Sequence, residues 1–293
     1  MADIPSSPVS RRDFLSTSAK LGAFIAAAPY IARGAAGTMA VVASVVLAMG
    51  VLLSAPIFPS AESSVYLIGY FPANAYHNPT MLMAKPLLVL SFASTVAALT
   101  RFGSVSVREA TLLVLPIVLL GLAKPNYLGC LLPVVGVAAV WCASRREAVS
   151  WQRVATVGGA AIITLASTFL LYRSEDLRMK GSVILAPFEV IAKYAPVDPL
   201  SIAEYLFRSL AFPVIVTMLW PLAVLRDVPM RIAWGATAIG LFISYFLAEG
   251  GERFDHGNFL WTGQMAVFVL FVAAAAFARS RLHWRSDSAV MFV

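Results

Sequence analysis

The largest group of chemically capable side chains lies between two apolar runs near the end of the chain. Three carboxylates, an arginine and a histidine fall within eight positions there: Glu249, Glu252, Arg253, Asp255 and His256. Glycines frame the segment and permit unusual backbone angles. A carboxylate or imidazole can move a proton, and arginine can bind phosphate. The segment therefore predicts a proton-transfer or phosphate site, with a solvated, salt-linked loop as the alternative.

Two lysines sit where long apolar runs begin or end, in Lys85-Pro86 and in Lys124-Pro125. Lys85 follows Pro79 by six residues, which places it about 9 Å into a helical run. An ionisable group at that depth is expensive unless it finds a partner. The candidate partners are the carboxylates of the segment above (Glu249, Glu252 and Asp255) and the phosphate of a lipid-linked substrate. The alternative is that both lysines extend to the headgroups.

Two further polar residues lie beside these positions. His77 precedes Asn78-Pro79-Thr80 at the start of an apolar run, and Asn126 follows Pro125 at a helix break. We count both as candidate ligands for the same phosphate. For His77 the alternative is a capped turn that starts the next helix.

Long apolar runs position all of these groups. The chain has 293 residues, 60% hydrophobic and 13% charged, with a mean hydropathy of +0.81, whereas soluble domains average about half apolar and a quarter charged. This composition excludes a soluble globular enzyme, a disordered chain and a disulfide-stapled secreted module. Since backbone polar groups must be satisfied within lipid, the runs predict about eight transmembrane helices in an all-α polytopic membrane protein: Thr38–Ile57, Thr80–Thr100, Glu109–Ala123, Tyr127–Ala143, Val154–Tyr172, Glu204–Leu225, Ile232–Ala248 and Phe259–Ala278.

The arginines predict the orientation. Every second connection and the tail together hold ten basic residues and four acids: Arg101, Arg108, Arg145, Arg146, Arg153, Arg226, Arg231, Arg279, Arg281 and Arg285 against Glu109, Glu147, Asp227 and Asp287. Cytoplasmic loops carry such an excess, so we expect both ends inside. The net charge of +7 is explained by this bias and predicts no nucleic-acid partner.

The first 37 residues form a separate segment. Arg11-Arg12-Asp13-Phe14-Leu15, an Ala-rich apolar stretch and small residues follow in the order of a twin-arginine export signal. Export of residue 34 onward conflicts with an inside N-terminus. The alternatives are an unused or transplanted signal, a basic cytoplasmic lead-in, or one short span that is not real, which would reverse the orientation. We divide the chain into this segment, a helical domain over residues 38–278 and a cytoplasmic tail over 279–293.

Other features predict less chemistry. Cys130 and Cys142 are about 18 Å apart on one helix, and no Cys/His spacing suits a metal, so we expect inert thiols, no metal and no cofactor. Phe188, Ile191 and Tyr194 have helical spacing in a segment after Pro187, which predicts a short helix in the outer interface. Four tryptophans, Trp261 among them, fall at span edges as in an aromatic belt.

Three of these motifs together resemble a family. His77-Asn78-Pro79-Thr80, Lys124-Pro125-Asn126 and the Glu252–Phe259 segment look like bacterial membrane glycosyltransferases (the GT-C class) and polymerases of surface-polysaccharide assembly. The resemblance implies an inner-membrane protein that uses polyprenyl-phosphate-linked sugars on the outer face. It implies Glu252, Asp255 and His256 as catalytic groups, with Lys85, Lys124, Arg253, His77 and Asn126 holding the lipid phosphate. A transporter or flippase without covalent chemistry, and an inactive chimeric reading frame, are the alternatives.

Overall fold

The computed structural model describes residues 79–144, 149–172, 183–193, 197–250, 254 and 259–290. The chain divides into two compact units, Met1–Val65 with Phe71–Leu82 and Tyr66–Tyr70 with Met83–Val293. The helices and strands discussed below belong to the second unit from Met83 onward, apart from the first four residues of α3, Pro79–Leu82, which belong to the first. The predicted span Thr38–Ile57 and the signal-like segment lie outside the described residues.

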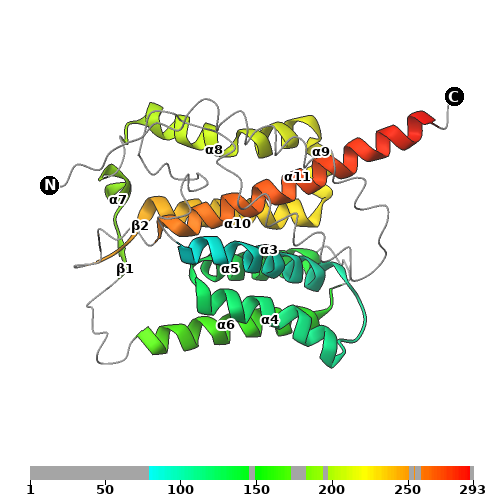
Figure 1. Cartoon of the computed structure of the whole chain (residues 1–293), viewed down its shortest axis with the longest axis horizontal. Coiled ribbons are helices and arrows are strands. Elements are labelled where there is room, and N and C mark those ends of the chain that lie inside the picture. Colours follow the sequence, from blue (N-terminus) through cyan, green and yellow to red (C-terminus); the bar gives the residue numbers. More distant parts are fainter. Residues whose placement is uncertain are drawn as a thin grey trace. The chain divides into compact units, whose positions relative to one another are not determined.

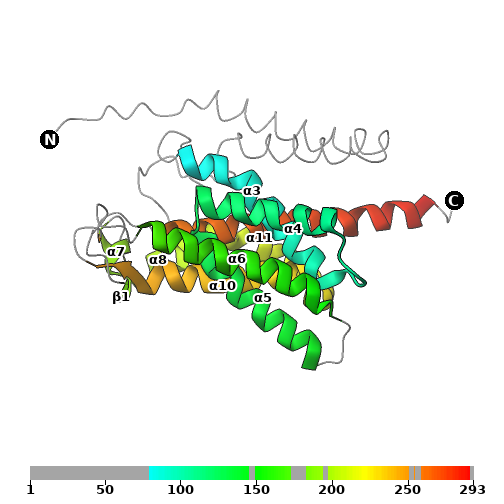
Figure 2. The same ribbon diagram turned by 90° about the horizontal axis from the view of Figure 1, so that it is seen from below.

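The described part of the chain is mostly helical. Long helices overlap the predicted runs: α3 (Pro79–Thr100), α4 (Val107–Ala123), α5 (Asn126–Ser144), α6 (Trp151–Tyr172), α8 (Pro199–Leu219), α10 (Val228–Phe246) and α11 (Leu260–Val290). The last of them, α11, continues twelve residues beyond the predicted end at Ala278. They lie side by side, with α11 packed on α10, α8 and α5, and α4 packed on α6 and α5 (Figures 1 and 2). The all-α expectation is confirmed for the long elements.

Three of the described helices are long and apolar enough to cross a membrane, namely Asn126–Ser144, Trp151–Leu170 and Leu260–Arg281. Large apolar side chains also stay exposed on the outward surfaces of α4, α5 and α6, including Leu112, Val137 and Ile163. Soluble proteins rarely expose so much contiguous apolar surface. These features indicate a membrane protein.

One predicted span is two helices. The run Glu204–Leu225 was expected to be continuous, but α8 ends at Leu219 and α9 (Pro221–Arg226) begins after Trp220. Trp220 leaves the helical conformation with φ −136° and ψ 55°, and proline suits the first turn of a new helix because it lacks an N–H. Hydropathy alone does not register this break.

The predicted span Ile232–Ala248 ends differently as well. Its last residues form β2 (Leu247–Glu249), which pairs antiparallel with β1 (Val183–Leu185) in a two-stranded sheet. The connection between α6 and α8 is thereby attached to the end of α10 (Figure 1).

The short helix after Pro187 exists as α7 (Glu189–Ala192), but it faces the protein. Ile191 is 1% exposed and packs with Tyr245, Ala248 and Leu260. The ring of Phe188 lies 5.5 Å from that of Tyr245 between centroids. The expectation of an apolar face lying in the lipid interface is therefore wrong for Ile191, because α10 and α11 already cover it.

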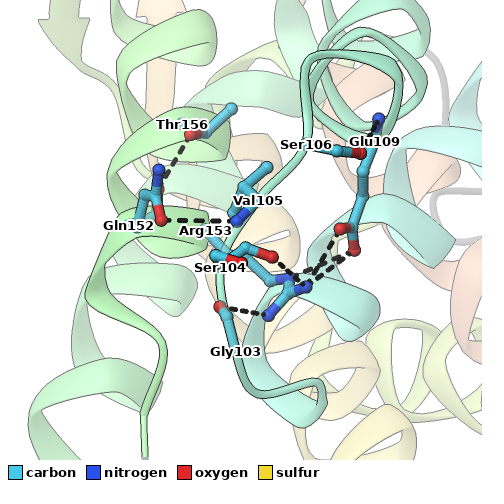
Figure 3. A network of polar contacts seen from close by, with 8 residues as sticks. All are labelled: Gly103, Ser104, Val105, Ser106, Glu109, Gln152, Arg153 and Thr156. Atoms are coloured by element: carbon cyan, nitrogen blue, oxygen red, sulfur yellow. Dashed lines mark hydrogen bonds and ion pairs between the residues drawn. The ribbon is translucent and has the colours of Figure 1, made fainter.

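Near the start of α4, Arg153 on α6 contacts both α4 and the connection that precedes it (Figure 3). Its guanidinium donates to both Glu109 carboxylate oxygens, at 2.9 and 3.0 Å for Nη2, and to the carbonyls of Gly103 and Ser104. Gly103 has a φ of +97°, which only glycine adopts readily. The start of α6 is thus fastened to the connection between α3 and α4.

Candidate functional site

Lys124 stands at the corner between α4 and α5. It is the C-cap of α4, where its N–H donates to the Leu120 carbonyl at 2.7 Å, and Pro125 then prevents the helix from continuing. Its ammonium lies 5.8 Å from the centroid of the Trp261 ring on α11, within the range of a cation–π contact. The helix break at Pro125 therefore places the Lys124 ammonium beside the first turn of α11.

A carboxylate near this cation opposes the effect of its burial. Burial lowers the pKa of Lys124 below its ordinary value of 10.5, and the nearby Glu249 carboxylate raises it. Glu249 is the last residue of β2, so the β1–β2 pairing holds it at this position. Glu249 is one of the three carboxylates predicted as lysine partners, and the other two, Glu252 and Asp255, lie outside the described residues.

We expect any anion bound by Lys124 to be released as the pH rises, and at a lower pH than an anion bound by an ordinary lysine. Only the protonated amine binds an anion, and a lowered pKa means that the proton leaves at lower pH. Glu249→Gln removes the influence that raises the pKa, so the loss should shift to still lower pH. Binding of a lipid phosphate measured from pH 7 to 10 tests this, and an unchanged profile in Glu249→Gln contradicts it.

Lys85 is far more buried. Its side chain lies on α3 and is 6% exposed, and its ammonium lies 5.2 Å from the centroid of the Phe268 ring on α11. A lysine buried this deeply in an apolar bundle is a functional candidate by default. The sequence-based prediction that Lys85 lies within a helical run is confirmed.

The two lysines approach the same face of α11 from different helices. Trp261 and Phe268 are seven residues apart, which is two helical turns and about 10 Å along the axis. Residues at this spacing share one face. The structure thus brings two predicted site residues onto one element, although they are 39 positions apart in the sequence. Asn126, the half-buried first residue of α5, lies at the same corner as Lys124.

The remaining predicted site residues lie outside the described residues. They are His77, Glu252, Arg253, Asp255 and His256. In the sequence, the last four of these residues come between β2 (Leu247–Glu249) and α11 (Leu260–Val290).

A shallow apolar depression lies where β2 ends and α11 begins. It is lined by Val190, Leu247, Ala248, Glu249, Phe254, Phe259 and Leu260. Lys193 lies 4.5 Å over the ring of Phe254 at its edge. Glu249 is the ionisable group among these lining residues, and it is the same carboxylate that acts on Lys124.

Sequence reasoning missed two members of this site. Trp261 was interpreted as part of an aromatic belt, but its ring contacts the Lys124 ammonium. Gln264, 7% exposed, lies between Trp261 and Phe268 on α11 and was not singled out. The sequence does show a glutamine in an otherwise apolar run. It does not show that this glutamine lies between the two lysines in the folded protein.

Within the described ranges, no group of three His, Cys, Asp or Glu side chains is arranged to hold a metal ion. Cys130 and Cys142 are buried, and they are not joined in a disulfide. Compared with family models, with curated proteins and with solved structures, the chain matches none.

Proposed function

We propose that the protein is a polytopic bacterial inner-membrane enzyme that transfers or polymerises sugars from polyprenyl-phosphate-linked donors. The observation that carries this proposal is the convergence of Lys124 and Lys85 on one face of α11. Two cations inside an apolar bundle suit an anionic ligand that arrives through the membrane. A lipid-linked phosphate has both properties.

The chemistry follows from the charge that the reaction generates. When a sugar leaves a lipid phosphate, negative charge develops on the departing oxygen, and nearby cations stabilise it in a site with little water. Lys124, Lys85 and Arg253 take this role in the proposal. Glu252, Asp255 or His256 removes the proton of the acceptor hydroxyl.

The proposal includes eight spans with both ends of the body in the cytoplasm. The arginine-rich connections then face the cytoplasm, and the corner of Lys124 faces outward with the segment before α11. Reporter tags at residues 36, 190 and 253 test this arrangement. We expect the tags at 190 and 253 outside; a cytoplasmic tag at 253 removes the proposal, and the tag at 36 decides whether the signal-like segment is used.

Substitution of one cation and one carboxylate tests the chemistry. We expect Lys124→Ala to reduce surface-glycan assembly by about 10²-fold, the loss typical of one electrostatic contact to a developing charge. Glu252→Gln should reduce it by about 10²–10⁴-fold if Glu252 is the base. Glycan measured in a deletion strain complemented with each variant gives the result.

Arg101→Ala is the matched control, because this exposed cation follows the last residue of α3, about 24 Å along the helix axis from Lys85. It should leave assembly unchanged. Full assembly with both Lys124→Ala and Glu252→Gln would refute the scheme.

A transporter is the second candidate, favoured by the polar side chains buried in the bundle, such as Ser91 and Gln264. Polar groups at depth also mark substrate paths. The deletion strain separates the two candidates, since a transporter predicts a defect in solute uptake with glycan intact.

A further inference from the structure

Gln264 carries a buried hydrogen-bonding atom that has no partner among the described residues. Its side chain is 7% exposed, and its Oε1 atom accepts no hydrogen bond from any residue in the described part of the chain. Buried polar atoms are almost always paired, so each exception needs an explanation.

The position of Gln264 supplies that explanation. It follows Trp261 by three residues and precedes Phe268 by four, which places all three on one face of α11. Lys124 lies over the first ring and Lys85 over the second. An unpaired acceptor therefore sits between two cations, each held against an aromatic ring.

We infer that this face of α11 binds the sugar phosphate headgroup of a glycolipid, with Gln264 accepting a hydrogen bond from a sugar hydroxyl. The lysine ammonium groups can bind an anionic group, whereas an amide oxygen binds a donor, and a bare phosphate dianion has no proton to give. A sugar phosphate supplies both groups in one molecule. The inference rests on the proposed function, and it adds that the sugar as well as the lipid phosphate is recognised here.

Trp261 fits the same ligand. Sugar rings have an apolar face of C–H groups, and the large indole ring is the aromatic side chain best able to cover it. The ring is half-buried and stands at the first turn of α11. Trp261 thus contacts a cation and can still offer ring surface to a neighbouring group.

The test compares lipids that differ only in the sugar. Full-length protein in detergent micelles is titrated with polyprenyl phosphate and with the same lipid carrying glucose, galactose or N-acetylglucosamine, and binding is followed by native mass spectrometry. We expect at least one glycolipid to bind about 10-fold more tightly than the bare lipid, the gain of one good hydrogen bond. Glucose 1-phosphate and inorganic phosphate serve as lipid-free probes, and comparable binding of the free sugar phosphate would assign the site to a soluble ligand.

Gln264→Met keeps the size of the side chain and removes the amide. It should abolish the preference for the glycolipid while leaving the affinity for polyprenyl phosphate within about 2-fold. Lys124→Gln should lower the affinity for polyprenyl phosphate and for the glycolipid by the same factor. Equal binding of all four lipids to the wild type, or a preference that survives Gln264→Met, overturns the inference.

Ser91→Ala is the matched control, because the Ser91 hydroxyl is also buried on α3 without a partner among the described residues. Removing either orphan atom should raise the melting temperature by about 2–4 °C. Only Gln264→Met should change sugar preference; identical behaviour of the two variants would show that Gln264 is merely structural. The two proposals can fail separately. If the purified protein prefers the glycolipid but the deletion strain still assembles its glycan, the proposed function is refuted and the inferred binding site stands.

Discussion

Arg153→Ala is expected to destabilise the protein by about 3 kcal/mol, which is the lower end of the range for breaking a buried ion pair by removing one partner. The Arg153 side chain is 5% exposed and that of Glu109 is 25% exposed. Removing the guanidinium leaves the Glu109 carboxylate and the carbonyls of Gly103 and Ser104 without their shared donor (Figure 3). Denaturant unfolding of the purified protein in detergent micelles measures the effect.

Two further variants separate charge from geometry. Arg153→Lys keeps the charge but loses the planar fork that reaches the carboxylate and two carbonyls at once, so we expect an intermediate loss. In a double-mutant cycle with Glu109→Gln, the two effects should fall short of additivity by about 1–3 kcal/mol, as for groups in one network. A loss below 1 kcal/mol for Arg153→Ala, or strict additivity, would show that the pair does not hold α6 to the connection before α4.

The helices were predictable because apolar runs of this length leave few alternatives. The prediction Thr80–Thr100 corresponds to Pro79–Thr100, and Tyr127–Ala143 corresponds to Asn126–Ser144. The break at Trp220 was missed because hydropathy averages over a window and does not register one residue that leaves the helical conformation. The strand Leu247–Glu249 was missed because it forms only by pairing with Val183–Leu185, more than sixty residues earlier.

The candidate site shows the same division. Lys85 and Lys124 were recognisable in the sequence as candidate site residues, since a lysine beside a proline in an apolar run is unusual. That both contact rings on α11 was not recognisable, because these contacts form only in the folded protein. Three carboxylates were equivalent partners in the sequence, and Glu249, the one of them that the structure describes, acts on the pKa of Lys124. Gln264 could not be recognised because an unpaired atom is a property of the folded protein alone.

The site depends on the close packing of α10 against α11, which small residues permit. Gly240 faces Ala266 and the backbone of Thr262 and Gly263. Ser244 on α10 donates from its hydroxyl to the Phe259 carbonyl at 2.8 Å and accepts from the Gly263 N–H at 2.9 Å. These contacts set the position of the first turns of α11, and hence of Trp261 and Gln264.

Gly240→Leu is therefore expected to destabilise the protein by about 3 kcal/mol and to remove lipid binding. A Cβ atom at position 240 already meets the Ala266 side chain and the Thr262 carbonyl closer than normal contact, and overpacking a filled interface costs about 1–3 kcal/mol or more. Backbone atoms cannot rotate away, so α10 and α11 must separate. Gly240→Ala should show the same effects in weaker form, by unfolding in micelles and by polyprenyl-phosphate binding.

Gly159 on α6 provides the matched control, since a Cβ atom there meets nothing within 4 Å. Gly159→Ala should stabilise the protein by up to about 1 kcal/mol, because alanine favours the helix over glycine. The two Gly→Ala substitutions are thus expected to have opposite signs, although both replace a helical glycine in an apolar helix. If Gly240→Ala stabilised the protein as Gly159→Ala does, α10 and α11 would not be in close contact at Gly240. The shared face of Trp261, Gln264 and Phe268 would then lack the support on which both proposals depend.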